Sequence, residues 1–430
     1  MLKQSKGNDL PLIGFFPLFY NLAETGRAVL VAKRYIESGG KAIFFSHGGK
    51  YEYLAKDIGC KVISVEPIYD NKFIEELWKY SRLEKFGPPF NKKILREHVD
   101  AEVAAYRSAG VEYVVSTNNF PCSLSTRVAG IPYFAITPRF SVDFQHYPED
   151  AEFFFTSIIP EWIKVRVLNW QFRRSKAWSR PFNTLAREYG VPGFRYPQQI
   201  THGDYTLFTD FIELANVRPS DKHENDFYIG PIFFDELFNS PLNDQKNVTK
   251  EINDHIKSKE KSILVSLGSS GTKELFENII GAFSRTNFRV IVVYTSVLSC
   301  NDLPECSDNI LLKQYVPSMR EVNEMVDLAV LHGGQGTVYT AAYSGKPVLG
   351  FPMQFEQHMN LEMLERKGMA RIASRRKFSQ EKFLGLVDEM FRNYDEYYLK
   401  AQGLAKSLPN PQGDVNACNI LLNILDKDKL

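Results

Sequence analysis

Residues 327–337 read DLAVLHGGQGT, an apolar run that ends in a histidine and a glycine-rich turn. The run LAVL has the length and apolarity of a buried strand, and the TVYTAAYSG that follows is typical of a helix ending at glycine. In open α/β sheets, ligands bind at the carboxyl ends of the strands, where such a turn lies. The glycines let a ligand approach the backbone, and the N-terminus of a helix favours an anion. This stretch therefore predicts an α/β fold with a phosphate-binding turn after His332.

Strand and helix patterns alternate on both sides of this turn. The first half runs from PLIGFF at 11–16 to YIGPIFF at 228–234, and the second half begins again with KSILVSLGSSGT at 261–272. Such alternation predicts doubly wound parallel sheets, and 430 residues exceed what one core usually serves. We expect Rossmann-like domains at 1–234 and 259–407, joined by a polar linker at 235–258. An amphipathic helix at 408–430 could return to the first domain.

The composition narrows the class of protein. Lys and Arg number 52 against 51 acidic residues, so no overall field attracts nucleic acid. The five cysteines form no pair or Cys/His set with zinc spacing, and no acidic pair resembles a metal clamp, so we expect neither a metal nor a cofactor. Neither a signal peptide nor a run of about 18 apolar residues is present, and we expect a cytoplasmic protein.

A second apolar run, PVLGFP at 347–352, leads to Glu356-Gln357, 24 residues after His332. This arrangement resembles the donor-binding signature of nucleotide-sugar glycosyltransferases of the GT-B fold, specifically family 1, which includes UDP-glycosyltransferases and macrolide glycosyltransferases. SLGSSGT at 266–272 resembles the first loop of the donor domain, and Tyr315-Val316-Pro317 resembles the segment beside the nucleobase. The resemblance implies two Rossmann-like doubly wound parallel-sheet domains facing a central cleft, the first binding an acceptor and the second a nucleotide sugar.

The resemblance also implies roles for single residues. Those that would hold the donor diphosphate are His332, Gly333, Gly334, Gln335, Gly336, Thr337 and Ser269. Tyr315 and Val316 would face the nucleobase, and Glu356 with Gln357 would bind sugar hydroxyls. The donor implied by default is a UDP-sugar. Many members carry a glutamate for the ribose where Thr340 stands here, and a threonine cannot accept two hydrogen bonds as a carboxylate does, so the nucleotide stays open.

Sugar transfer with inversion needs a base for the acceptor hydroxyl. In the related family this base is usually a histidine after the first strand, and the family pattern places Glu24 near that position. Its alternative role is that of a carboxylate stabilising a helix N-terminus. His47, which follows the second strand, is a rival base at the same sheet edge, although a single histidine in a loop is often incidental.

A tryptophan-rich stretch at 151–180 interrupts the alternation. Trp162 and Trp170 alternate with basic residues. Aromatic faces suit an acceptor pocket for an apolar or lipid-like molecule. The same pattern fits helices packed on the sheet, with Arg and Lys stems covering it, or a helix on a membrane surface.

The resemblance thus favours a glycosyltransferase that moves a hexose from a nucleoside diphosphate sugar to a hydroxyl of a small acceptor. A nucleotide-sugar epimerase of the same fold is one alternative, and it would need more acidic and histidine residues around the sugar. A non-catalytic nucleotide-sugar-binding partner is the other, because the usual base histidine is missing.

Overall fold

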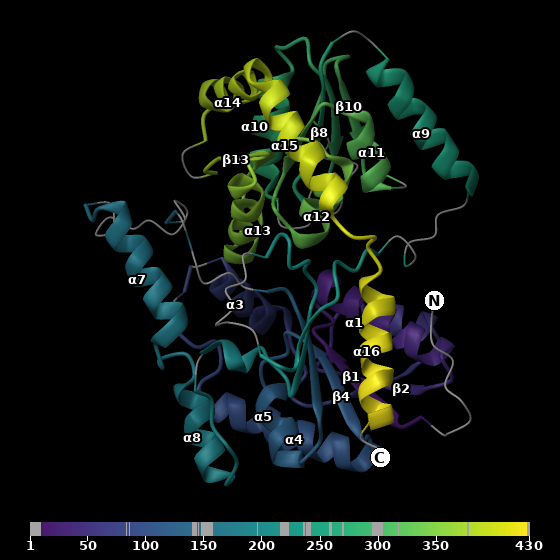
Figure 1. Ribbon diagram of the computed structural model, residues 1–430, viewed down its shortest axis with the longest axis vertical. Coiled ribbons are helices and arrows are strands. Elements are labelled where there is room, and N and C mark those ends of the chain that lie inside the picture. The colour runs from purple at the N-terminus through teal and green to yellow at the C-terminus, as the bar shows by residue number, and fades with distance from the viewer. Residues whose placement is uncertain are drawn as a thin grey trace. The chain divides into compact units, whose positions relative to one another are not determined.

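The computed structural model describes residues 10–82, 84–85, 87–139, 144, 146–147, 158–195, 197–215, 223–234, 237, 242–257, 260–268, 271–294, 304–316, 318–375 and 378–427. The chain forms two compact units, each built on one parallel sheet (Figure 1). The first unit comprises Met1–Asp143, Arg166–Leu237 and Asn410–Leu430. The second comprises Phe144–Val165 and Phe238–Pro409.

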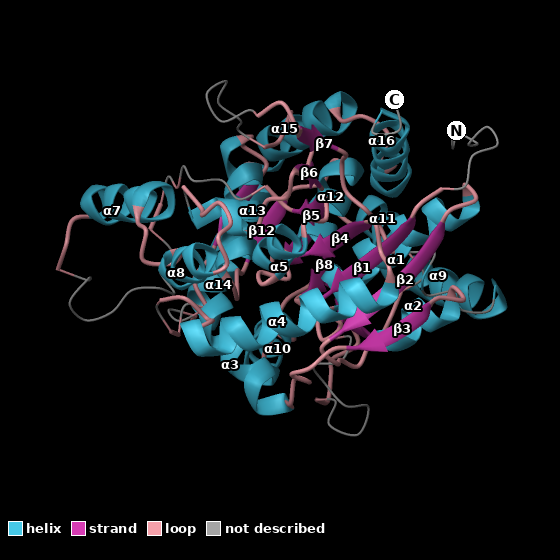
Figure 2. Ribbon diagram, turned by 90° about the horizontal axis from the view of Figure 1, so that it is seen from below, coloured by secondary structure: helices cyan, strands magenta, loops and turns pink. Residues whose placement is uncertain are grey.

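The sheet of the first unit has seven strands in the order β3-β2-β1-β4-β5-β6-β7, all parallel. Its strands are β1 (Leu12–Pro17), β2 (Lys41–Ser46), β3 (Lys61–Ser64), β4 (Tyr113–Thr117), β5 (Tyr133–Thr137), β6 (Tyr205–Phe208) and β7 (Asp226–Tyr228). The order reverses between β1 and β4, which is the point where doubly wound sheets bind ligands. Figure 2 shows these strands side by side with helices around them.

Both faces of this sheet are buried. Phe15 and Val115 pack in one core with the first helix, whereas their chain neighbours Phe16 and Val114 pack in another core on the opposite face. This follows from the alternation of side chains along a strand. The continuous apolar runs IGFF and YVV are therefore the expected pattern of strands covered on both sides.

The helices of the first unit lie in the sequence between these strands, with one late addition. They are α1 (Leu22–Glu37), α2 (Glu52–Asp57), α3 (Asn71–Ser81), α4 (Lys92–Ala109), α5 (Cys122–Ala129), α8 (Arg180–Glu188), the short η2 (Pro197–Ile200) and the C-terminal α16 (Gly413–Lys427). Helix α16 packs beside α1, and Leu421 is fully buried in their common core (Figure 1). Arg34 Nε lies 2.6 Å from Asp414 Oδ2 and links the two helices.

The second unit has six parallel strands in the order β10-β9-β8-β11-β12-β13. They are β8 (Ser262–Ser266), β9 (Arg289–Val293), β10 (Ile310–Lys313), β11 (Leu328–Leu331), β12 (Val348–Gly350) and β13 (Ala370–Ile372). The helices assigned to this unit are α9 (Leu242–Ile256), α10 (Lys273–Phe283), α11 (Met319–Met325), α12 (Gln335–Ser344), α13 (Phe355–Arg366), α14 (Gln380–Arg392) and α15 (Tyr394–Ser407). Helix α7 (Glu161–Arg174) contains the sequence boundary between the units. The order reverses between β8 and β11, so the predicted phosphate turn lies at the switch point of this sheet.

The structure departs from the expected domain boundaries in two places. Most of the polar stretch expected as a linker forms α9, whose Ile252 is fully buried against Leu264 of β8. Residues 144–165 belong with the second unit. The Phe144 ring lies 4.8 Å from the Phe355 ring of α13, and the His146 N–H donates to Glu362 Oε1 at 3.1 Å.

Replacing Leu421 with alanine should destabilise the first unit, because it leaves a cavity between α16 and α1. Large-to-small changes in a core cost about 2–5 kcal/mol of unfolding free energy. Denaturant unfolding, followed for the transition of the first unit, measures the loss. Asp426→Ala changes an exposed position of the same helix and should stay within about 0.5 kcal/mol of the parent. Equal losses for the two variants would contradict this packing.

Candidate functional site

The turn after β11 is held by its neighbouring strand. The His332 N–H donates to the carbonyl of Ser266, the last residue of β8, at 3.3 Å. The ring Nδ1 of His332 lies 3.4 Å from the same oxygen. The ring also fills the space beside Gly268 and Gly334, where an added Cβ would come within 2.6 and 2.4 Å of it. The histidine is therefore fixed in position between the ends of two adjacent strands.

Gly333 is required by its conformation and by its neighbour. Its φ is +88°, and a Cβ at this position would lie 2.5 Å from the carbonyl oxygen of Gln357 in α13. Asn360, one turn further along α13, donates from its side chain to the Gly333 carbonyl at 3.0 Å. Asn360 was not among the residues expected from the sequence. Its position four residues after Glu356 puts it near the same helix face.

Helix α12 begins directly after this turn, with Gly334 as its N-cap and no side-chain cap. The first N–H groups of a helix have no intrahelical partner and carry the positive end of its dipole. Gly336 is exposed, and a Cβ there would meet open space. Thr337 donates its hydroxyl to the Gly334 carbonyl at 2.8 Å and so tightens the first turn. This arrangement can bind an anion such as a phosphate.

His332 is neutral at pH 7 in this structure. Burial lowers its pKa from 6.5 to about 4, and the hydrogen bond to Ser266 opposes this shift. If Nδ1–H donates to Ser266, as the geometry favours, Nε2 carries the lone pair. The turn therefore offers an anion dipoles and N–H groups, and its histidine adds no full positive charge.

The other expected donor residues differ in their surroundings. Tyr315 follows β10 and its side chain is 64% exposed, whereas Val316 packs against the core formed by α9, β8 and β9. Gln357 is buried, and its side-chain oxygen accepts the Met353 N–H at 2.8 Å. Glu356 is half-buried in the first turn of α13. Ser269 lies outside the described residues.

Glu24 lies at the carboxyl edge of the first sheet, in the first turn of α1, and is 3% exposed. Its Oε1 accepts from Arg27 at 2.9 Å and from the Asn118 side chain at 2.8 Å. Its Oε2 is buried and has no hydrogen-bond partner among the described residues. A buried oxygen without a partner costs about 1–3 kcal/mol, more when the group is charged, so such an atom indicates a place for a hydrogen-bond donor.

Asn118 was missed by the sequence reasoning. It follows β4 at the switch point and has a φ of +51°, which is uncommon for a residue other than glycine. Its side-chain oxygen accepts the Thr137 hydroxyl at 2.9 Å while its amide donates to Glu24. Asn118 thus orients the carboxylate. The only sequence signal was a polar Asn-Asn pair at the end of an apolar strand.

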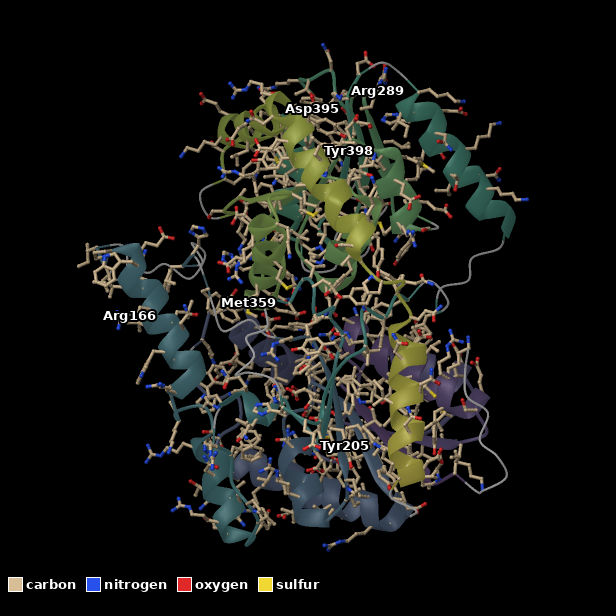
Figure 3. The ribbon with its side chains drawn as sticks, in the orientation of Figure 1. Arg166, Tyr205, Arg289, Met359, Asp395 and Tyr398 are labelled. Atoms are coloured by element: carbon tan, nitrogen blue, oxygen red, sulfur yellow. The ribbon has the colours of Figure 1, made fainter. Side chains whose placement is uncertain are left out.

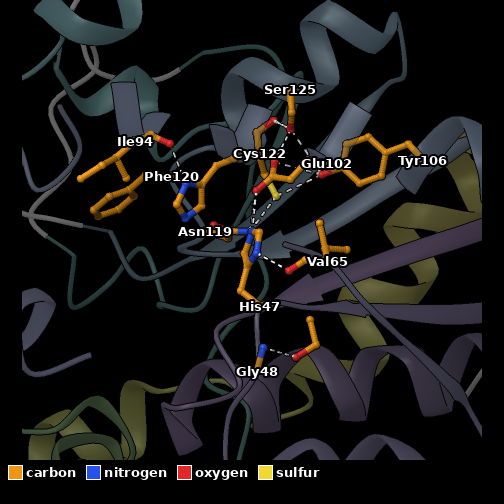
Figure 4. Close-up of polar contacts among 12 residues, drawn as sticks. His47, Gly48, Val65, Ile94, Glu102, Tyr106, Asn119, Phe120, Cys122 and Ser125 are labelled. Atoms are coloured by element: carbon orange, nitrogen blue, oxygen red, sulfur yellow. Dashed lines mark hydrogen bonds and ion pairs between the residues drawn. The ribbon is translucent and has the colours of Figure 1, made fainter. Parts of the chain in front are cut away.

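His47 lies in a buried network shown in Figure 4. Its Nδ1 is 2.9 Å from the Val65 carbonyl and its Nε2 is 3.2 Å from Glu102 Oε1. Glu102 also accepts from Ser125, Tyr106 and the Asn119 amide. Both ring nitrogens of His47 therefore face hydrogen-bond acceptors of the protein. Neither nitrogen presents a lone pair to a substrate. This arrangement disfavours His47 as the base.

Trp162 and Trp170 lie on α7 with 66% and 57% of their surface exposed. The acceptor-pocket role expected for these two residues stays a prediction. Within the described part of the chain, no group of three or more His, Cys, Asp or Glu side chains is arranged to hold a metal ion.

The unfolding free energy of the second unit should fall as the pH drops from 6.5 towards 4. In that window the unfolded chain binds a proton at His332 that the folded chain excludes, because the folded pKa is the lower one. The loss from this residue reaches up to about 3 kcal/mol near pH 4. Denaturant unfolding at several pH values measures it. His332→Gln should flatten the slope, and an unchanged slope would exclude a buried neutral ring.

Comparisons with known proteins agree with these observations. Residues 262–410 match the family model of the glycosyltransferase family 28 C-terminal domain. The chain is 27% identical over 289 residues to a PGL/p-HBAD biosynthesis glycosyltransferase of Mycobacterium tuberculosis, a match covering 65% of this chain and 63% of that protein. This chain therefore spans less than two thirds of the length of that relative. A PGL/p-HBAD biosynthesis rhamnosyltransferase of Mycobacterium bovis is 24% identical over 373 residues, covering 84% of this chain and 77% of the relative.

The fold has known counterparts over its whole length. The crystal structure of the glycotransferase of kitacinnamycin superposes with a TM-score of 0.62 at 17% identity, covering 98% of both chains. The expected fold class, two Rossmann-like parallel-sheet domains, is thereby confirmed. The chain therefore has the GT-B fold, and its residues 262–410 are similar to the family 28 C-terminal domain of glycosyltransferases.

Proposed function

We propose that the protein is a glycosyltransferase that moves a hexose from a nucleoside diphosphate sugar to a hydroxyl of a small, apolar or lipid-like acceptor, with inversion. A UDP-sugar is the donor that we propose first. The relative named as a rhamnosyltransferase makes a deoxyhexose the second sugar to test. No metal or organic cofactor is part of the proposal.

The second unit would bind the donor. The uncapped start of α12 and the close-approach glycines after β11 suit a pyrophosphate. Glu356, in the first turn of α13, would bind sugar hydroxyls, and the exposed Tyr315 ring would cover the nucleobase. The Gln357 oxygen accepts the Met353 N–H, which holds this side chain in place at the start of α13.

The observation that supports catalysis most is the unpartnered Oε2 of Glu24. Arg27 and Asn118 both bind Oε1, which leaves Oε2 to accept the hydrogen of an acceptor hydroxyl. A simple helix-stabilising carboxylate would have no reason to be buried with one oxygen unpaired. The rival, His47, has both nitrogens engaged.

The proposed transfer forms one bond at the anomeric carbon and breaks another. The acceptor oxygen forms a bond to the anomeric carbon while its proton passes to Glu24 Oε2. The bond from the anomeric carbon to the diphosphate oxygen breaks, and the nucleoside diphosphate leaves with the electron pair. N–H groups at the start of α12 would stabilise the charge that develops on it.

Replacing Glu24 with glutamine should lower kcat by about 10²–10⁴-fold, since a positioned base contributes that much and an amide accepts no proton. Binding of the nucleotide sugar should not change. Initial rates with a panel of hydroxyl acceptors and a UDP-sugar, together with calorimetric donor binding, measure the two effects.

Glu37→Gln is the matched control, because Glu37 is a carboxylate at the other end of the same helix, paired with Arg34. It should keep the parent rate. Full turnover of the Glu24→Gln variant would remove Glu24 from the mechanism. Donor binding without transfer to any acceptor, in the parent protein, would favour the non-catalytic alternative.

Replacing Gly333 with alanine should disturb the donor turn, because the new Cβ meets the Gln357 backbone oxygen and the φ is unfavourable for alanine. Such overpacking costs about 1–3 kcal/mol of unfolding free energy. The stabilisation of the second unit by UDP, read from its thermal transition, should fall as well. Gly403→Ala in α15, where a Cβ meets open space, is the control: it should keep the UDP response and raise the unfolding free energy by about 0.5–1 kcal/mol, because alanine is the better helix former. An unaltered UDP response in Gly333→Ala would separate this turn from nucleotide binding.

A further inference from the structure

Large apolar side chains are unusually exposed around α7. Ile158, Trp162, Val167 and Trp170 are four of the nine most exposed large hydrophobic residues in the described part of the chain. They fall within 13 consecutive positions, whereas the other five are scattered over both units. Single exposed apolar residues are ordinary, but a contiguous group indicates an interaction surface.

The helix arranges these residues in one row with arginines. Trp162, Arg166, Trp170 and Arg174 are spaced by four residues, and all four are exposed. Residues four apart lie on neighbouring turns of the same face, so the row extends about 18 Å along the helix. Figure 3 labels Arg166 within this row on α7. We call these four side chains the Trp/Arg row.

Within the described part of the chain, the basic side chains of this row have no acidic partner. Arg166 and Arg174 form no ion pair among the described residues, and the same holds for the exposed Lys176 and Arg180 that follow. The acidic side chain at the start of α7, Glu161, lies 3.2 Å from His146 Nδ1. The surface from 162 to 180 is therefore positive and aromatic in its described part, in a protein whose net charge is only +1.

We propose that the Trp/Arg row is a docking surface for an anionic lipid bilayer, with α7 lying along the membrane surface. Tryptophan favours the interfacial layer of a bilayer, where its ring is apolar and its N–H meets water. Arginines beside it can bind lipid phosphates while their stems stay among the acyl chains. The proposed partner is a lipid surface, and binding it is a function beyond the transfer reaction.

Other features of the chain favour this partner over nucleic acid. A nucleic acid tracks a basic groove or patch of many phosphate contacts, whereas this chain has a near-neutral net charge and one short basic row. Among the described residues, no helix has the length and apolarity needed to cross a bilayer.

Vesicle flotation of the full chain tests the proposal. Vesicles of phosphatidylcholine mixed with phosphatidylglycerol should bind the protein, and binding should weaken with added salt. Phosphatidylcholine alone should bind at least about tenfold more weakly. Arg166→Glu/Arg174→Glu should reduce binding to the anionic vesicles by at least about thirtyfold, and Trp162→Ala/Trp170→Ala by at least about tenfold.

Matched controls separate the row from general effects. Lys382→Glu/Lys427→Glu makes the same change in net charge at two exposed positions, and Leu399→Ala removes another exposed apolar side chain. Both should bind vesicles within about twofold of the parent. Equal binding to neutral and anionic vesicles would overturn the proposal, and so would unchanged binding of both row variants. So would lost turnover on a water-soluble acceptor in the tryptophan variant with vesicle binding intact, because the row would then belong to the acceptor site.

Discussion

The pairing of β11 between β8 and β12 is the interaction on which the donor site depends. Parallel register brings the ends of these three strands to one edge, so His332 meets the Ser266 carbonyl and Gly333 meets α13. A register slip of one residue would turn His332 to the opposite face of the sheet. The backbone ladder of a buried sheet therefore sets the position of the turn before any side chain acts.

The buried parallel strands are also the part of the fold that the sequence could predict. Short continuous apolar runs such as LAVL and YVVS are typical of strands covered on both faces, and the glycine-rich turn after LAVL indicates where the next helix begins. His332 and Gln357 lie at the same edge of the sheet because they follow the paired strands β11 and β12, and this placement required only the order of strands and helices. In contrast, the mostly polar composition of 235–258 favours a linker, whereas the structure has α9 there. Its apolar positions Val248, Ile252 and Ile256 form a single stripe four residues apart, which is enough to pack on the sheet.

The catalytic side was harder to predict, because partners in space decide it. Glu24 and His47 follow neighbouring strands and were both candidates. The structure gives His47 an acceptor at each nitrogen, and it gives Glu24 two donors at one oxygen and, among the described residues, none at the other. The left-handed conformation of Asn118 is what aims one of those donors. Neither property can be read from residue type or spacing.

The electrostatics of the donor turn bear on the proposed reaction. A neutral His332 means that the turn would hold a dianionic leaving group by dipoles and N–H groups, each contributing only about 0.3–2 kcal/mol. Several must act together, which requires the backbone to be fixed before the ligand arrives. Gly268, Gly333 and Gly334 provide that, since their lack of side chains lets two strand ends and a helix pack around one ring. A site of this kind stabilises charge that develops during transfer without a permanent cation, so it need not retain the nucleotide once the bond has broken.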